Sequence, residues 1–111
     1  EALDAADLLA QQGCAAQVWK INEISETYRL LSDEMRGQLC DRVLVLEDVI
    51  HSGCVGMNVI EAVGQKCEVR LCNTGNHFMP HGSVQEVYRC CGIDSGSVAQ
   101  KIMDWMQEKK A

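Results

Sequence analysis

The stretch 43–64, VLVLEDVIHSGCVGMNVIEAVG, holds the residues best suited to bind an anion or to transfer protons. An apolar run leads into Glu47 and Asp48 and a histidine, and the glycines Gly53 and Gly56 then precede a helix-like pattern. Strand, glycine loop and helix in this order is the arrangement that holds phosphates in nucleotide-binding proteins. The first question is whether this loop binds a ligand or only turns the chain.

The loop lacks the residues that a phosphate site needs. A Walker loop requires Lys and then Ser or Thr after its last glycine, whereas Met57 and Asn58 follow Gly56. A dinucleotide fingerprint requires three glycines, and only two are present. The two acids before the loop would also repel a phosphate. We therefore expect Gly53 and Gly56 to allow a tight turn and a close approach of helix to strand.

Histidine and cysteine could form a metal site or a nucleophilic pair. His77 and His81 would share one helix face, but Pro80 and the nearby glycines indicate a loop, which disfavours a metal site. Cys54 and His51 could pair as nucleophile and base, but no third group that would orient the histidine is evident. We predict no catalytic, cofactor-binding or metal-binding residue in this chain.

Charge and composition exclude several classes of protein. The 111 residues include 10 Lys and Arg against 16 Asp and Glu, for a net charge of -6, and the cations are scattered. Nucleic acid and anionic membrane surfaces would repel such a chain, and no apolar run reaches the length of a membrane span. Seven cysteines, an odd number without a CxxC pair, favour reduced, partly buried thiols in a cytoplasmic protein.

Apolar residues at helical spacing predict two helices in the first two thirds of the chain, with a weaker pattern between them. The first helix ends at Gly13, the weaker pattern runs from 24 to 39, and the other helix follows Gly56 and ends at Gly64. The residues expected to form the apolar stripes of the two helices are Leu3, Ala6, Leu8, Leu9, Val55, Val59, Ile60 and Val63.

Two further helices are predicted near the C-terminus. Ser83 and Glu86 form a capping box, and Gly92 closes the helix that follows. Asp94 or Ser95 caps the last helix, whose C-terminal dipole Lys109 and Lys110 complement. The residues expected to form its buried stripe are Val98, Ile102, Trp105 and Met106.

Three short apolar runs predict strands: AAQVWKI (15–21), RVLVLED (42–48) and CEVRLC (67–72). The second is continuous, as expected of a strand covered on both faces. Alternating helices and strands indicate an α/β fold with three layers, α/β/α, and a mostly parallel sheet. Because the chain opens on a helix, we expect a first strand upstream of Glu1 in a longer protein. The aromatic residues expected in the core are Trp19, Tyr28, Tyr88 and Trp105.

Two segments form longer patterns. In the first, an apolar strand is followed by Glu47-Asp48-Val49-Ile50, a turn at Gly53 and Gly56, and a helix. The second is FMPHGSVQEVYRCCGIDSGSVAQKIMDW, and its residues at matching positions are Phe78, His81, Gly82, Ser83, Gly92, Ile93 and Asp94. Both patterns resemble the C-terminal domain of the transketolase-like, thiamine-diphosphate-dependent enzymes, most closely the 1-deoxy-D-xylulose-5-phosphate synthase family. The resemblance covers nearly the whole chain.

The resemblance implies a transketolase C-terminal-domain-like fold over residues 1–111, as a fragment of a longer enzyme. In that family thiamine diphosphate lies between the two preceding domains, and the third domain supplies packing and dimer contacts. It therefore implies that this domain holds neither thiamine diphosphate nor Mg²⁺, is inactive alone, and contacts the preceding domains within a homodimer. The parent enzyme would condense pyruvate with glyceraldehyde 3-phosphate at the start of isoprenoid synthesis.

Other interpretations stay open. The segments NEISETYRLL and CNTGNH depart from the family's pattern, so the parent could be another transketolase-like enzyme. A free-standing domain that binds a nucleotide or small molecule through the Gly53–Gly56 loop is an alternative of a different class. A lone interaction module of the same fold, with another chain as its partner, is the third.

His81 is expected to have a structural role. It precedes Gly82, which allows a sharp turn, and Ser83, which caps the helix, while Phe78 offers an apolar anchor. A histidine there can hydrogen-bond the loop backbone and fix the start of the helix. Proton transfer or metal binding is the alternative, but no carboxylate lies in the same loop to tune the imidazole.

Overall fold

The computed structural model describes residues 1–21, 41–76 and 81–108, in two compact units. Residues 20–77 form one unit, and residues 1–19 together with 78–111 form the other. No helix within the described residues is both long enough and apolar enough to cross a membrane.

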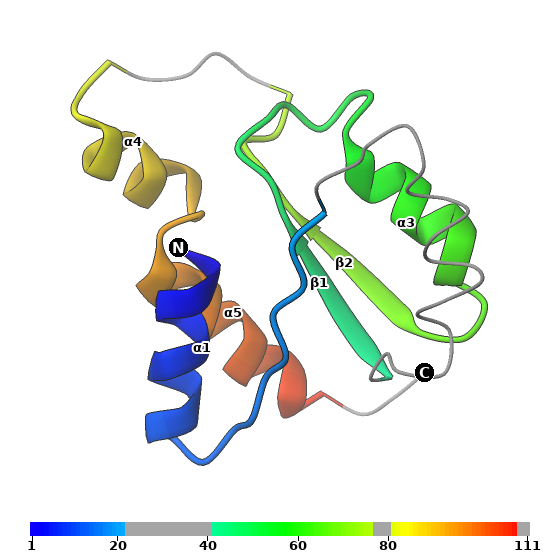
Figure 1. Cartoon of the computed structure of the whole chain (residues 1–111). Helices are drawn as coiled ribbons and strands as arrows, with labels where there is room; N and C mark the ends of the chain where they lie inside the picture. Colours follow the sequence, from blue (N-terminus) through cyan, green and yellow to red (C-terminus); the bar gives the residue numbers. More distant parts are fainter. Residues whose placement is uncertain (22–40, 77–80, 109–111) are drawn as a thin grey trace. The chain divides into compact units, whose positions relative to one another are not determined.

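The described residues of the 20–77 unit contain a strand–helix–strand motif. Strand β1 (Arg42–Leu46) is followed by helix α3 (Val55–Val63) and strand β2 (Glu68–Cys72), as Figure 1 shows. The two strands are parallel, and their register runs from Arg42 opposite Glu68 to Leu46 opposite Cys72. A parallel pair needs a crossover connection, which α3 supplies. Helices that alternate with a parallel sheet confirm the predicted α/β class.

The core of this unit lies between α3 and one face of the sheet. Val59 and Val63 are buried and pack against residues that include Val45 and Val69. All residues of β1 are half-buried, and α3 covers one face of the sheet, so the predicted cover of the other face stays a prediction. The prediction for Ile60 is wrong, because it is 38% exposed. It follows Val59 by one residue, which turns it about 100° away from the sheet.

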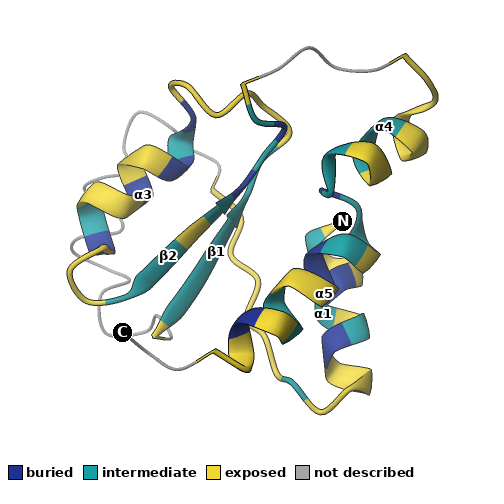
Figure 2. Cartoon of the chain, turned by 180° about the vertical axis from the view of Figure 1, so that it is seen from behind, coloured by how far each residue is buried: buried dark blue, intermediate teal, exposed yellow. Residues whose placement is uncertain are grey.

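The described residues of the other unit form three helices: α1 (Ala2–Gln11), α4 (Val84–Cys91) and α5 (Ser95–Met106). α1 packs against α5, and the dark positions of both helices in Figure 2 mark their buried faces. The buried residues of α1 and α5 are Ala5, Leu9, Val98, Ala99 and Trp105.

Local signals set the helix ends in this unit. The Gly13 amide donates to the Ala10 carbonyl, and the Cys14 amide donates to the Leu9 carbonyl. Because Gly13 also has a φ of 82°, α1 ends in a Schellman motif. Gly92, with a φ of 74°, ends α4 in the same way. The capping box of Ser83 and Glu86 is present.

Several apolar residues lie in places that the sequence does not predict. Leu3 is 70% exposed because α1 packs through Ala5, and two residues along a helix correspond to about 200°. Met106 is 54% exposed for a related reason, since it follows the buried Trp105 by one residue. Tyr88 is half-buried on α4. The residues of these predictions that lie outside the described part of the chain are Tyr28, Lys109, Lys110 and the 24–39 helix.

The prediction of a strand at 15–21 is wrong. This segment is extended without strand structure, and Trp19, expected in the core, is 44% exposed. A strand is defined by hydrogen bonds to a neighbouring strand, and the described sheet consists of β1 and β2 alone. The predicted three-layer packing concerns how the two units lie together and stays a prediction.

Candidate functional site

Two loops meet at the carboxyl ends of β1 and β2, which is the edge of a parallel sheet where α/β proteins usually bind ligands. The first loop, 47–54, follows β1 and leads into α3. The second, 73–76, follows β2. Glu47, Asp48 and Gly53 of the sequence-predicted set lie in the first loop, and Gly56 lies in the first turn of α3.

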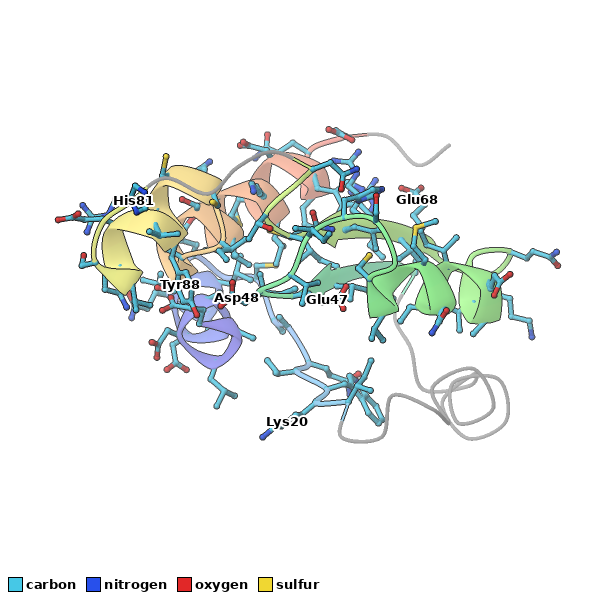
Figure 3. The ribbon with its side chains drawn as sticks, turned by 90° about the horizontal axis from the view of Figure 1, so that it is seen from above. Lys20, Glu47, Asp48, Glu68, His81 and Tyr88 are labelled. Carbon is cyan, nitrogen blue, oxygen red and sulfur yellow. The ribbon has the colours of Figure 1, made fainter. Side chains whose placement is uncertain are left out.

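Glu47 occupies the N-terminus of α3. Its two carboxylate oxygens accept hydrogen bonds from the backbone amides of Val55 at 2.8 Å and Gly56 at 2.9 Å. Figure 3 shows Glu47 beside this first turn. Cys54, at the N-cap position, makes no side-chain capping bond. A negative charge at this end of a helix interacts favourably with the helix dipole, so Glu47 caps α3 from a distance in sequence.

The two glycines of the loop have different geometries. Gly53 has a φ of 75°, a conformation that residues with a side chain rarely adopt. Gly56 is buried, and a Cβ atom there would lie 2.5 Å from Leu71 Cδ2 and 3.1 Å from Glu47 Oε2. The absence of a side chain thus lets α3 approach β2 closely and keeps its first amides open to Glu47.

This arrangement does not fit a phosphate or the diphosphate of thiamine diphosphate. A phosphate at a helix N-terminus is held by the free backbone amides of the first turn. Here the amides of Val55 and Gly56 already donate to a carboxylate, whose charge would also repel a second anion. Among the described residues, no group of three or more His, Cys, Asp or Glu side chains could hold a metal ion.

Backbone and side-chain hydrogen bonds join the two loops. The His51 amide donates to the Gly75 carbonyl at 3.0 Å. The Thr74 amide and hydroxyl both donate to the Val49 carbonyl, at 3.0 and 2.9 Å. The Ser52 amide and hydroxyl both donate to Asn76 Oδ1, at 3.0 and 3.1 Å. The edge of the sheet is therefore a single cross-linked polar surface.

Asn73 adds a side-chain link that the sequence does not predict. Its Oδ1 accepts a hydrogen bond from the Gly75 amide at 2.9 Å. Its Nδ2 lies 3.3 Å from His51 Nδ1 and 3.9 Å from Cys54 Sγ. The only sequence signal for such a residue is a polar side chain directly after a strand.

The nucleophile–base pair of Cys54 and His51 gains no support from this geometry. The thiol is buried, and the helix terminus that would stabilise a thiolate already holds the Glu47 carboxylate. Asn73 presents its amide nitrogen to both side chains and cannot accept a proton from either. The six described cysteines, at positions 14, 54, 67, 72, 90 and 91, are free thiols.

The residues of the second sequence motif belong to the other unit. His81 is exposed and finds no hydrogen-bond partner among the described residues. Residues 77–80 of its loop lie outside the described residues, so its expected structural role stays a prediction. Figure 3 shows His81 close to the start of α4, where Ser83 and Glu86 provide the capping bonds at 3.2 and 3.3 Å. Gly82 lies against the Glu86 side chain. Phe78 lies outside the described residues.

Two carboxylates cap α5 in the other unit. The Ser95 amide donates to Glu1 Oε2 at 2.7 Å, and this hydrogen bond is the main cause of the lowered pKa of Glu1. Asp94 accepts a hydrogen bond from the Ser97 amide at 3.2 Å, and its pKa is lowered mainly by hydrogen bonding to Ser97. These hydrogen bonds cap and stabilise α5, and they do not by themselves indicate a functional site.

Comparison with known proteins shows which chains this one resembles. No protein-family model matches the sequence. A 1-deoxy-D-xylulose-5-phosphate synthase of Parabacteroides distasonis is 30% identical over 69 residues, or 60% of this chain. The synthase of Caldanaerobacter subterraneus is 26% identical over 99% of this chain. A chain of known structure, described as a split-gene transketolase in an inactive β4 tetramer, superposes over 98% of this chain with a TM-score of 0.76.

The chain resembles the C-terminal domain of 1-deoxy-D-xylulose-5-phosphate synthase. The resemblance inferred from the two sequence motifs is therefore confirmed. At 22% identity, the transketolase chain supports the fold alone, and this chain covers 36% of it. This chain spans 11% of the length of the Parabacteroides distasonis synthase and 18% of the length of the Caldanaerobacter subterraneus synthase. It is thus similar to a part of these synthases, and its fold is similar to a part of the transketolase chain.

Proposed function

We propose that this chain forms the C-terminal domain of a thiamine-diphosphate-dependent enzyme of the 1-deoxy-D-xylulose-5-phosphate synthase type. The parent enzyme would decarboxylate pyruvate and join the two-carbon unit to glyceraldehyde 3-phosphate. Sequence similarity to such a synthase over 99% of the chain is the observation that carries this proposal.

Within that enzyme the domain has a structural role and no catalytic one. The Glu47 carboxylate on the first amides of α3 supports this role, because it fills the place that a phosphate group of cofactor or substrate would take. Thiamine diphosphate and Mg²⁺ would then be held by the other domains. The chain alone would be inactive.

Exposed apolar side chains support a role in contacts with other domains. In the 20–77 unit, Val49, Ile50 and Met57 are between 44% and 54% exposed, and all three lie in the 47–54 loop or at the start of α3. Apolar residues grouped at one edge of a domain are typical of interaction surfaces. The partners would be the preceding domains of the same enzyme and a second copy in a homodimer. The free thiols of the described cysteines favour a cytoplasmic location.

Turnover of the isolated chain tests the proposed division of roles. The 111-residue chain is incubated with pyruvate, glyceraldehyde 3-phosphate, thiamine diphosphate and Mg²⁺, with the full-length Bacteroides fragilis synthase, a relative 30% identical over 69 residues, as the positive control. We expect pyruvate consumption by the control and none by the isolated chain. Turnover by the isolated chain would show that the domain carries the catalytic residues and would refute the structural role.

Two measurements separate the proposal from its alternatives. The coding sequence of the gene decides between a domain and a free-standing binding protein, because only the former has a thiamine-binding region upstream of Glu1. A thermal-shift measurement with ATP, NAD and thiamine diphosphate tests ligand binding directly. A ligand at one hundred times its Kd stabilises a protein by about 2.7 kcal/mol, which such a measurement detects. We expect no shift with any of the three.

A further inference from the structure

The amide of Asn73 presents a hydrogen-bond donor to His51. The Gly75 amide can only donate, so the Asn73 atom that it contacts at 2.9 Å is the carbonyl oxygen Oδ1. The other end of the same amide group, Nδ2, therefore faces His51 Nδ1 at 3.3 Å. An amide nitrogen has no lone pair to accept a proton, so Nδ1 must be unprotonated and accept the hydrogen bond. The imidazole is then neutral, with its proton on Nε2.

We propose that protonation of His51 releases the Asn73 amide and loosens the pairing of the 47–54 and 73–76 loops. An imidazolium ion carries protons on both nitrogens, so its Nδ1–H would point at the Asn73 NH₂ group. His51 is exposed, and its ring can turn away into water. The pairing of the loops should therefore weaken when His51 takes up a proton.

His51 has charged and titratable neighbours along its own loop and at the start of α3. Its own loop contributes Glu47 and Asp48, and the N-cap of α3 contributes the Cys54 thiol. The 73–76 loop contains Asn, Thr, Gly and Asn, none of which titrates. His77, the next residue along the chain, lies outside the described residues and is controlled for by substitution.

The Thr74 amide is a probe of loop pairing, because it donates to the Val49 carbonyl at 3.0 Å across the two loops. Its native-state hydrogen exchange is measured in the 111-residue chain at pH 7.5 and pH 5.5, corrected for the intrinsic pH dependence of exchange. Loss of one neutral hydrogen bond should lower the protection of this amide about fivefold at the lower pH.

Variants assign the effect to His51. In His51→Gln the Gln oxygen can accept from Asn73 at both pH values, so protection should not fall. In Asn73→Ala the donor is absent, and protection should again be independent of pH in this range. His81→Gln is the matched control, since His81 is an exposed histidine without a partner among the described residues, and His77→Gln is the second. Both should keep the fivefold fall.

Three results would overturn the proposal. Wild-type protection that does not change with pH would show that the contact is insensitive to the imidazole. A fivefold fall that persists in His51→Gln would assign the effect to another group. A fall that disappears in His77→Gln would assign it to that residue. If His51→Gln does not fold, Asn73→Ala decides the same question, and a persisting fall there also refutes the proposal.

Discussion

Replacement of Glu47 by Ala should destabilise the 20–77 unit by about 2–4 kcal/mol. The change removes two hydrogen bonds, at 2.8 and 2.9 Å, from the first amides of α3 to a charged acceptor. Hydrogen bonds to charged groups contribute about 1.5–3 kcal/mol each, and the site is only half-buried, so water will replace part of the loss. Glu47→Gln retains one acceptor oxygen and should cost about half as much.

The free energy of unfolding of this unit is measured through native-state hydrogen exchange of the amides that pair β1 with β2. Glu61→Ala is the matched control, because Glu61 is an exposed glutamate on the same helix. That substitution should change stability by no more than about 0.5 kcal/mol.

The vacated helix terminus provides a second measurement. With Glu47 removed, the amides of Val55 and Gly56 become free to bind an anion. Inorganic phosphate should therefore raise the Tm of Glu47→Ala more than that of the wild type, relative to chloride at equal ionic strength. A loss below about 0.5 kcal/mol in Glu47→Ala, or an equal phosphate effect on both proteins, would refute the assignment of Glu47 as the anion at this helix terminus.

Two further predictions concern the helical unit. Gly92→Ala should destabilise it by about 1–2 kcal/mol, because Gly92 has a φ of 74° and a Cβ atom would lie 2.7 Å from Lys101 Nζ. The control Gly96→Ala, in α5, should be neutral or stabilising. Equal urea midpoints for the two variants would contradict this prediction. The pKa values of Glu1 and Asp94 are lowered from their ordinary values of 4.5 and 3.8. The two carboxylates therefore contribute fully to the free energy of unfolding above these ordinary values, and the contribution is lost as the pH falls through the lower pKa values of the folded state. Glu1→Gln and Asp94→Asn should each reduce the acid loss of the urea midpoint below pH 4.5, and an unchanged acid loss would contradict the assigned contacts.

Features that depend on neighbours in sequence could be predicted from the sequence. Ser83 and Glu86 are three residues apart and satisfy each other's backbone amides, whatever the rest of the chain does. Gly92 ends α4 because it adopts a positive φ without steric cost. The apolar runs of β1 and β2 likewise predict two strands in the right places. The α/β class follows from their alternation with helices.

The orientation of each helix was decided by packing. Ala5 and Trp105 are buried, whereas Leu3 and Met106, which share the same helices, face solvent. A 3.6-residue period allows several neighbouring stripes, and only the partner surface selects one of them. The same holds for Trp19, whose apolar segment has no neighbouring strand in the described sheet.

The chemistry of the candidate site belongs to the tertiary structure. From the sequence, Glu47 is an acid that repels phosphate, whereas in the fold it is the anion that caps α3, eight and nine residues further along the chain. Asn73 contacts His51 across 22 positions, which no local pattern indicates. The sequence determined the positions of the described helices and of β1 and β2, because apolar runs, turns and caps are local. The parallel pairing of β1 with β2 decided which polar groups meet, because it brings the carboxyl ends of both strands to one edge.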